Sequence, residues 1–86
     1  MKIEYSSSFI KMFNSLEKDL ADEVYEKLNL FKDKKNHKML NVHKLHGALK
    51  NRYSFSVNYK IRIVFGFIEK NKAVMHAIGG HNLYKN

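Results

Sequence analysis

Apolar residues recur with two different periods along this chain, which predicts helices in its first part and strands in its second. Between residues 9 and 31 most apolar positions lie three or four apart, as on one face of a helix. The first group is Phe9, Met12, Phe13 and Leu16, and the second is Leu20, Val24, Leu28 and Phe31. Serines at 6–8 offer N-cap hydroxyls, and in the second helix acidic residues precede lysines, which complements the helix dipole. We therefore expect a helical hairpin whose apolar face covers a sheet.

After the polar segment 32–38, apolar residues alternate with polar ones, as in strands with one buried face. Four strands are expected, at 42–45, 52–57, 61–68 and 73–79, with a weaker first strand at 2–5. Their short connections predict an antiparallel meander. The expected fold is α+β: residues 1–86 form a single domain, in which an N-terminal strand and a helical hairpin pack on one face of a four-stranded, mainly antiparallel twisted sheet.

Arg62 interrupts the most apolar of these strands, and the strand register explains its position. A three-residue loop at 58–60 sets Phe55 opposite Ile63 and keeps the apolar side chains on one side. A two-residue loop would set Phe55 opposite Arg62, which the pleat disfavours because a one-residue slip inverts every face. Arg62 therefore belongs, opposite Ser56, to the face that the helices leave uncovered.

The same reasoning places two further features near Arg62. A four-residue hairpin loop before the last strand sets Phe67 opposite Val74 and Arg62 opposite Gly79, whose missing side chain leaves space beside the guanidinium. His81 follows on the same face. Two interpretations remain open: these groups form an anion site, or the arginine and the histidine are exposed structural residues.

The composition is that of a small soluble domain. The 86 residues include no cysteine, which suits a reducing cytosol and excludes disulfides and thiolate metal sites. No stretch approaches the roughly 18 apolar residues of a membrane span, and the N-terminus has no apolar signal core. We expect a cytoplasmic protein.

The net charge of +8 is concentrated in one part of the chain, which indicates a polyanionic partner. Between residues 32 and 52, seven lysines and arginines accompany a single acid, Asp33. Such side chains bind nucleic acid by neutralising phosphates and releasing counterions. The candidate RNA-binding residues are Lys34, Lys35, Lys38, Lys44, Lys50 and Arg52. The alternative interpretation is a solvated loop.

Histidines are the best candidates for chemistry, because their unperturbed pKa of about 6.5 allows proton transfer near neutrality. His46 and His81 each lie beside a glycine at a strand end, and Tyr84 adds a phenol. His76 lies mid-strand and is interpreted as a core or edge histidine. On a strand His43 and His46 point to opposite faces, and with no cysteine and few acids nearby we expect no metal site and no cofactor.

Other catalytic classes lack the residues that they need. No glycine-rich phosphate loop links a strand to a helix, and Glu69 is the only acid in the last fifty residues. RNA cleavage fits what remains, since the substrate's own 2′-hydroxyl is the nucleophile. The protein then has to remove one proton, supply another and stabilise charge at the phosphate, which cations and histidines can do.

One long segment resembles the RelE/ParE superfamily of bacterial and archaeal toxins, and most of all its RelE and YafQ-like RNA-cleaving branch. It spans residues 43–84 and reads HKLHGALKNRYSFSVNYKIRIVFGFIEKNKAVMHAIGGHNLY. The order of elements extends the likeness to essentially the whole chain. The resemblance implies two helices packed on an antiparallel sheet, and metal-independent cleavage of messenger RNA, usually on the ribosome, silenced by a cognate antitoxin.

Carried over by position, the resemblance implies roles for four residues. Arg62 matches the sheet arginine that contacts the scissile phosphate, and His46 matches the histidine of the YafQ-like LHG. His81 falls where members carry a catalytic histidine or arginine after the last strand. Tyr84 falls where they carry a closing aromatic residue.

The chain departs from the family on the strand before Arg62. RelE carries lysines where this chain has Ser54 and Ser56, and the YafQ-like histidine of that strand is absent, so the general base is not identified. Two functions therefore remain open. One is a ribosome-dependent mRNA endoribonuclease; the other is a non-nucleolytic protein, either a ParE-like gyrase inhibitor or a degenerate member that only binds its antitoxin. A cognate antitoxin is the expected partner, in a hetero-oligomeric complex.

Overall fold

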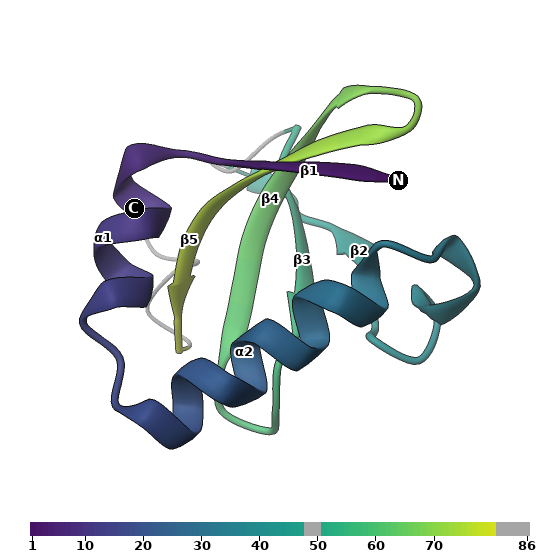
Figure 1. Ribbon diagram of the computed structural model, residues 1–86. Helices are drawn as coiled ribbons and strands as arrows, with labels where there is room; N and C mark the ends of the chain where they lie inside the picture. Colours follow the sequence, from purple (N-terminus) through teal and green to yellow (C-terminus); the bar gives the residue numbers. More distant parts are fainter. Residues whose placement is uncertain (48–50, 81–86) are drawn as a thin grey trace.

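In the computed structural model, which describes residues 1–47 and 51–80, two helices lie over one face of a sheet (Figure 1). The elements are β1 (Lys2–Tyr5), α1 (Ser7–Asn14), α2 (Lys18–Phe31), the 3-10 helix η1 (Lys34–Asn36), β2 (His43–Lys44), β3 (Tyr53–Ser56), β4 (Arg62–Glu69) and β5 (Lys72–Gly79). The helical hairpin and the strands predicted from the two periods are all present. Within the described ranges, no helix is both long enough and apolar enough to cross a membrane.

The sheet has five strands, in the order β1-β5-β4-β3-β2. Strands β2 to β5 form the expected antiparallel meander, and β1 pairs in parallel with β5, from Lys2 opposite Lys72 to Tyr5 opposite Met75. The α+β prediction is confirmed, but the sheet has one strand more than the four expected. The reason is that the edge of β5 would otherwise carry unpaired backbone groups, and β1 satisfies them together with its own.

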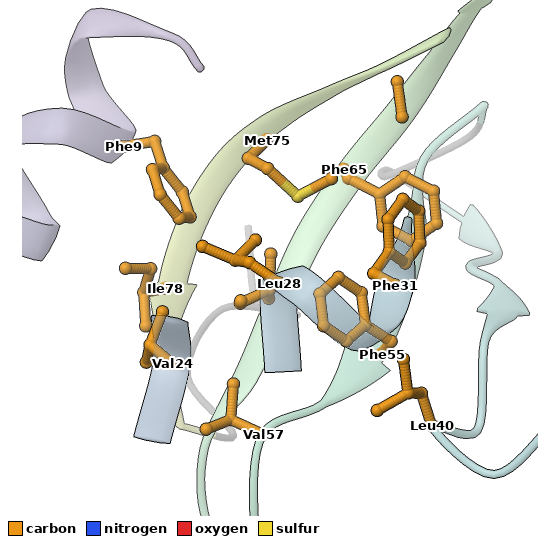
Figure 2. Packing of buried hydrophobic residues seen from close by; sticks show 12 residues of the cluster. Phe9, Val24, Leu28, Phe31, Leu40, Phe55, Val57, Phe65, Met75 and Ile78 are labelled. Carbon is orange, nitrogen blue, oxygen red and sulfur yellow. The ribbon is translucent and has the colours of Figure 1, made fainter. Parts of the chain in front are cut away.

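An aromatic-rich core lies between the helices and the sheet (Figure 2). The ring of Phe31, at the end of α2, lies 4.8 Å from the rings of both Phe55 on β3 and Phe65 on β4. Helix α1 begins where the Ser6 hydroxyl accepts a hydrogen bond from the Phe9 backbone N–H at 3.0 Å, which confirms the predicted N-cap. This cap fixes the residue at which α1 begins. Phe9, in the first turn of the helix, is buried in the core.

The predicted register of the β3–β4 hairpin is confirmed. Phe55 lies opposite Ile63, and Ser56 lies opposite Arg62. Arg62 therefore lies on the face away from the helices. This placement follows from the pleat alone, because successive side chains of a strand point to opposite faces.

The register of the β4–β5 pair shifts within the strands. The opposite pairs include Arg62 and Gly79, Val64 and Ala77, Phe65 and Met75, and Phe67 and Ala73. The first pair agrees with the prediction, whereas the last differs by one residue from the expected Val74. The cause is a bulge, in which His76 is an extra residue on β5 without a counterpart on β4. The strands also extend to Glu69 and Lys72, so the connecting turn is shorter than expected.

The centre of the face away from the helices is buried. Ser54 lies opposite Val64 on this face, yet Ser54 is fully buried and Val64 is 5% exposed. Leu45, just after β2, is also buried and lies outside the main core cluster. The expectation of an uncovered face is therefore wrong here, because the pleat sends these three side chains to the same side, where they form a second, smaller buried region.

Candidate functional site

Arg62 directly follows the loop 58–61, and its guanidinium bonds to that loop. Nη1 donates to the carbonyl oxygen of Asn58 at 2.7 Å and to that of Tyr59 at 3.1 Å, with a longer contact of 3.4 Å to that of Ile61. Nη1 is therefore bonded within the chain itself. The physical reason is proximity: the arginine begins β4 directly after the loop whose carbonyl oxygens it bonds.

The side chain of Asn58 stabilises the loop 58–61 through hydrogen bonds. Its Oδ1 accepts hydrogen bonds from the backbone N–H groups of Lys60 and Ile61, both at 2.8 Å. Its Nδ2 donates to the Glu23 carboxylate on α2 at 2.7 Å. The loop that binds Arg62 is thus fixed to the helical layer, and the arginine is positioned before any ligand arrives.

The rest of the Arg62 guanidinium can take an anion. Within residues 1–47 and 51–80, its Nε and Nη2 atoms make no hydrogen bond, so these donors remain. Gly79 lies opposite Arg62 on β5, so no side chain stands at the paired position beside the guanidinium. A planar guanidinium held on one nitrogen presents its other edge with geometry suited to a phosphate.

His46 is exposed and lies at the far end of β3 from Arg62. The Leu45 backbone N–H bonds to the Arg52 carbonyl, whereas Arg62 lies opposite Ser56. Arg52 and Ser56 are four residues apart along an extended chain, or roughly 13 Å. The structure therefore does not bring His46 beside Arg62. Outside the described residues lie His81, Tyr84 and Lys50.

The predicted RNA-binding residues divide into two groups. Lys34 and Lys35 lie in η1, and Lys38 follows it; all three are exposed, and Lys35 pairs with Asp33 at 3.5 Å. The second group lies on the sheet, with Lys44 on the edge strand β2 and Arg52 just before β3. The basic stretch is therefore divided between η1 and the β2–β3 side of the sheet.

Lys34 also borders a hollow of about 860 Å³ between the end of α2 and the β4–β5 turn. The basic residues that line it with Lys34 are Lys2, Lys32, Lys70 and Lys72, and the acidic ones are Asp33 and Glu69. Three of these lysines lie outside the basic stretch of the sequence. Sequence reasoning missed them because they are brought together by strand pairing, not by spacing along the chain.

Arg52 and His76 meet on the face away from the helices, above Gly66. A methyl group at Gly66 would lie 3.5 Å from His76 Nε2 and 3.8 Å from Arg52 Nη1. Burial lowers the pKa of His76 below its ordinary value, and the neighbouring Arg52 guanidinium lowers it further. Sequence reasoning took His76 for a core or edge residue; the available signal was Gly66, because a glycine inside a strand often marks close approach of other groups.

The other described histidines have local partners. The His37 ring stacks on Phe31 at 4.5 Å, and its Nε2 lies 2.8 Å from the Phe31 carbonyl oxygen. His43 Nδ1 lies 2.9 Å from the Asn41 carbonyl oxygen. In the part of the chain that the structure describes, no three histidine, cysteine or acidic side chains are grouped to hold a metal ion.

Comparison with known proteins gives matches in structure but not in sequence. No family model matches this chain, and no curated protein matches it. A chain of the toxin–antitoxin complex RelBE2 from Mycobacterium tuberculosis matches with a TM-score of 0.74 and 12% identity, over 93% of this chain and 96% of that chain.

Two further solved structures represent other branches. YafQ from E. coli strain BL21(DE3) matches with a TM-score of 0.61 and 16% identity, over 99% of this chain and 98% of that chain. The YoeB/ParE toxin from Agrobacterium tumefaciens matches with a TM-score of 0.67 and 12% identity, over 94% and 99%. The chain therefore has the fold of RelE, YoeB, YafQ and ParE toxins, as the resemblance in its sequence implied.

Proposed function

We propose that this protein is the toxin of a type II toxin–antitoxin system, and that it cleaves messenger RNA on the ribosome. The observation that carries the proposal is Arg62, held through Nη1 by the loop 58–61 with its remaining donors unbonded within the described ranges. A fixed guanidinium on this toxin fold suits the stabilisation of charge that develops on a scissile phosphate.

In the proposed reaction the substrate supplies its own nucleophile. The 2′-oxygen attacks the adjacent phosphorus, the bond from phosphorus to the 5′-oxygen breaks, and Arg62 stabilises the extra negative charge. One proton leaves the 2′-hydroxyl and one reaches the leaving oxygen. His81 and Tyr84, from the resemblance, are the proposed proton carriers, and no metal ion or cofactor is required.

Ser54 on β3 is not the general base of the proposed reaction. Ser54 occupies a position where RelE carries a lysine, and it is fully buried. A serine has no basic group near neutral pH, and a buried one does not reach a substrate at the surface. Proton removal therefore falls to a histidine or to the substrate's surroundings on the ribosome.

The two groups of basic residues would hold the RNA and the ribosome. Lys34, Lys35 and Lys38 are exposed around η1, and Lys44 is exposed on the edge strand β2. Contacts from such lysines to phosphates are independent of sequence and weaken with salt. They would position the RNA without taking part in proton transfer.

A small antitoxin is the proposed partner. RelBE2, one of the structural matches, is a toxin–antitoxin complex. The net charge of +8 favours an acidic partner segment, and such segments fold as they bind. Cytoplasmic action follows from the ribosomal substrate.

The second candidate is a protein without nuclease activity, such as a ParE-like gyrase inhibitor. The observation that favours it is the pair Ser54 and Ser56 in place of the RelE lysines, and a YoeB/ParE toxin is among the structural matches. This alternative shares the fold and the antitoxin. It differs in predicting no cleavage of RNA.

Mapping messenger RNA 5′ ends after induced expression separates the two. New 5′ ends within codons, appearing with the wild-type protein and not with Arg62→Ala, are expected for the endoribonuclease. Growth arrest without new 5′ ends would refute cleavage and favour the second candidate. Purified protein with programmed ribosomes repeats the test in vitro.

A further inference from the structure

The bulge on β5 changes which side chains face away from the helices. Met75 and Ile78 both belong to the core, and two residues separate them instead of the odd number that strict alternation requires. The extra residue is His76, next to Ala77, which lies opposite Val64 on the other face. The bulge therefore places His76 over the β4 backbone, away from the helices.

Arg52 reaches the same point from the other side of β4. It extends the β3 register by one residue, which sets it opposite Gly66. Since a methyl group at Gly66 would contact both His76 Nε2 and Arg52 Nη1, the two nitrogens border the space that the missing side chain leaves. The Asn51 carbonyl oxygen, at 3.8 Å, borders it too. Two nitrogens and one carbonyl oxygen thus lie within van der Waals distance of the position that a methyl group at Gly66 would take.

Neither the Arg52 guanidinium nor the His76 imidazole is paired with another group of the described part of the chain. Within residues 1–47 and 51–80, the side chains of Arg52 and His76 form no hydrogen bond and no ion pair. Glu4, opposite Val74 on β1, is the nearest acid by register, and its carboxylate pairs with Lys72 at 2.8 Å. The Arg52 guanidinium therefore carries an unpaired positive charge at this site, and its donors remain unbonded there.

We propose that Arg52 and His76 form a second phosphate-binding subsite above Gly66, which holds the RNA strand at a distance from Arg62. Gly66 and Arg62 lie on the same face of β4, four residues or roughly 13 Å apart. The subsite would therefore take a different phosphate of the same strand. The RNA part of this inference rests on the proposed function.

The chemistry of the pair favours a phosphate. A guanidinium bonds two oxygens of a phosphate, and a protonated imidazole adds a further charge-assisted donor. Burial and Arg52 hold the pKa of His76 down, and a bound phosphate would oppose both effects, so binding should raise that pKa. RNA affinity should accordingly increase as the pH falls. Among the described residues, the other charged or titratable groups around this face are Arg62 on β4, Glu4 with Lys72, and His43 on β2, opposite Ser54.

The test is an NMR titration of the full chain with a 2′-O-methyl RNA hexanucleotide, which cannot be cleaved through the 2′-oxygen. The imidazole signals of His76 are followed against pH with and without the oligonucleotide, and with inorganic phosphate. An upward shift of the His76 pKa with the oligonucleotide is expected. No shift, or a shift with inorganic phosphate only, would overturn the RNA subsite.

Three variants should weaken hexanucleotide binding. They are Arg52→Gln, His76→Gln and Gly66→Ala. The first two should do so about tenfold each, the loss expected for one charge-assisted hydrogen bond, and the third by placing a methyl group beside the two nitrogens. The added methyl in Gly66→Ala meets its neighbours at ordinary contact distances, so it should fill the gap without unfolding the protein. Lys18→Gln, which removes one exposed charge from α2, is the matched control.

The inference is overturned if Arg52→Gln and Gly66→Ala, with unchanged melting temperatures, bind as tightly as Lys18→Gln. Its failure is distinct from failure of the proposed function. Wild-type protein that cleaves RNA without a His76 shift would refute the subsite alone. Protein that shows the shift without cleaving would refute the nuclease and leave the subsite standing.

Discussion

Arg62 donates a hydrogen bond from Nη1 to the Asn58 carbonyl oxygen at 2.7 Å, so the candidate catalytic arginine also closes the loop before its own strand. Asn58 is tied in turn to Glu23 on α2. Function and stability are therefore coupled at this residue. Any substitution of Arg62 has to be measured for both.

Replacing Arg62 by alanine should lower both the rate of cleavage and the stability of the fold. Cleavage should fall by about two to three orders of magnitude, a typical loss for one electrostatic donor. The free energy of unfolding should fall by about 1–3 kcal/mol, because charged hydrogen bonds to loop carbonyls are lost. Arg62→Lys should recover part of the cleavage rate and part of the stability, because an ammonium keeps the positive charge but lacks the planar pair of N–H donors of a guanidinium.

The measurement is ribosome-dependent cleavage by each Arg62 variant, well below its melting temperature, alongside urea denaturation. Normal cleavage by folded Arg62→Ala would make the arginine purely structural. The same conclusion would follow if cleavage by Arg62→Ala equals that of the wild type once the rate is divided by the amount of folded protein.

Asn58→Ala should destabilise the protein by about 1–3 kcal/mol, since it removes three hydrogen bonds of a partly buried side chain. The neighbouring Tyr59, 93% exposed, supplies the control: Tyr59→Ala should change stability by less than about 0.5 kcal/mol. Both are compared by urea denaturation. Equal stability of the two variants would show that the loop does not depend on Asn58.

Neutralising the exposed lysines around η1 should weaken ribosome binding. With Lys34, Lys35 and Lys38 changed to glutamine, the slope of log affinity against log salt should fall by about 2–3, if each lysine neutralises one phosphate. Lys11, Lys18 and Lys27, on α1 and α2, are changed together as the charge-matched control. Sedimentation with ribosomes over a range of salt gives the slope. Identical slopes for the two triple variants would show that the segment 34–38 is a solvated loop that does not contact the ribosome.

His76 should make stability depend on pH. Burial and Arg52 hold the pKa of His76 below its ordinary value in the folded protein, so the unfolded chain binds a proton first as the pH falls. The stabilisation is thus present above the unfolded pKa of about 6.5 and is lost below it. Between about pH 7 and pH 5, the wild type should lose more stability than His76→Gln.

The control for this pH dependence is His43→Gln, which removes an exposed histidine. Denaturation by urea is followed at each pH for the three proteins. If His76→Gln loses as much stability on acidification as the wild type and His43→Gln, the histidine is not desolvated in solution.

Co-expression with an antitoxin should silence the protein. A small protein encoded beside it should restore growth, and the two should purify as one complex, as expected for an acidic segment on a basic surface. Growth assays and co-purification check this outcome. A protein that is harmless when overexpressed alone, with no such partner, would contradict the toxin assignment.

Local regularities in the sequence were enough to predict most of the fold. The stripe of Leu20, Val24, Leu28 and Phe31 predicts α2, and the alternation around Arg62 predicts its face and its partners Ser56 and Gly79. These features depend only on the direction of each side chain relative to its neighbours in the chain. That direction repeats with the period of the helix or strand, so the sequence by itself determines it.

Only the tertiary structure decided how distant segments meet. The bulge at His76, the approach of Arg52 to Gly66, and the bonds from Arg62 to its loop have no periodic signature. The same is true of the burial of Ser54, which an alternating pattern places on an uncovered face. Such features depend on which backbone groups pair and how closely separate strands pack, and the spacing of residues along one strand carries no record of either.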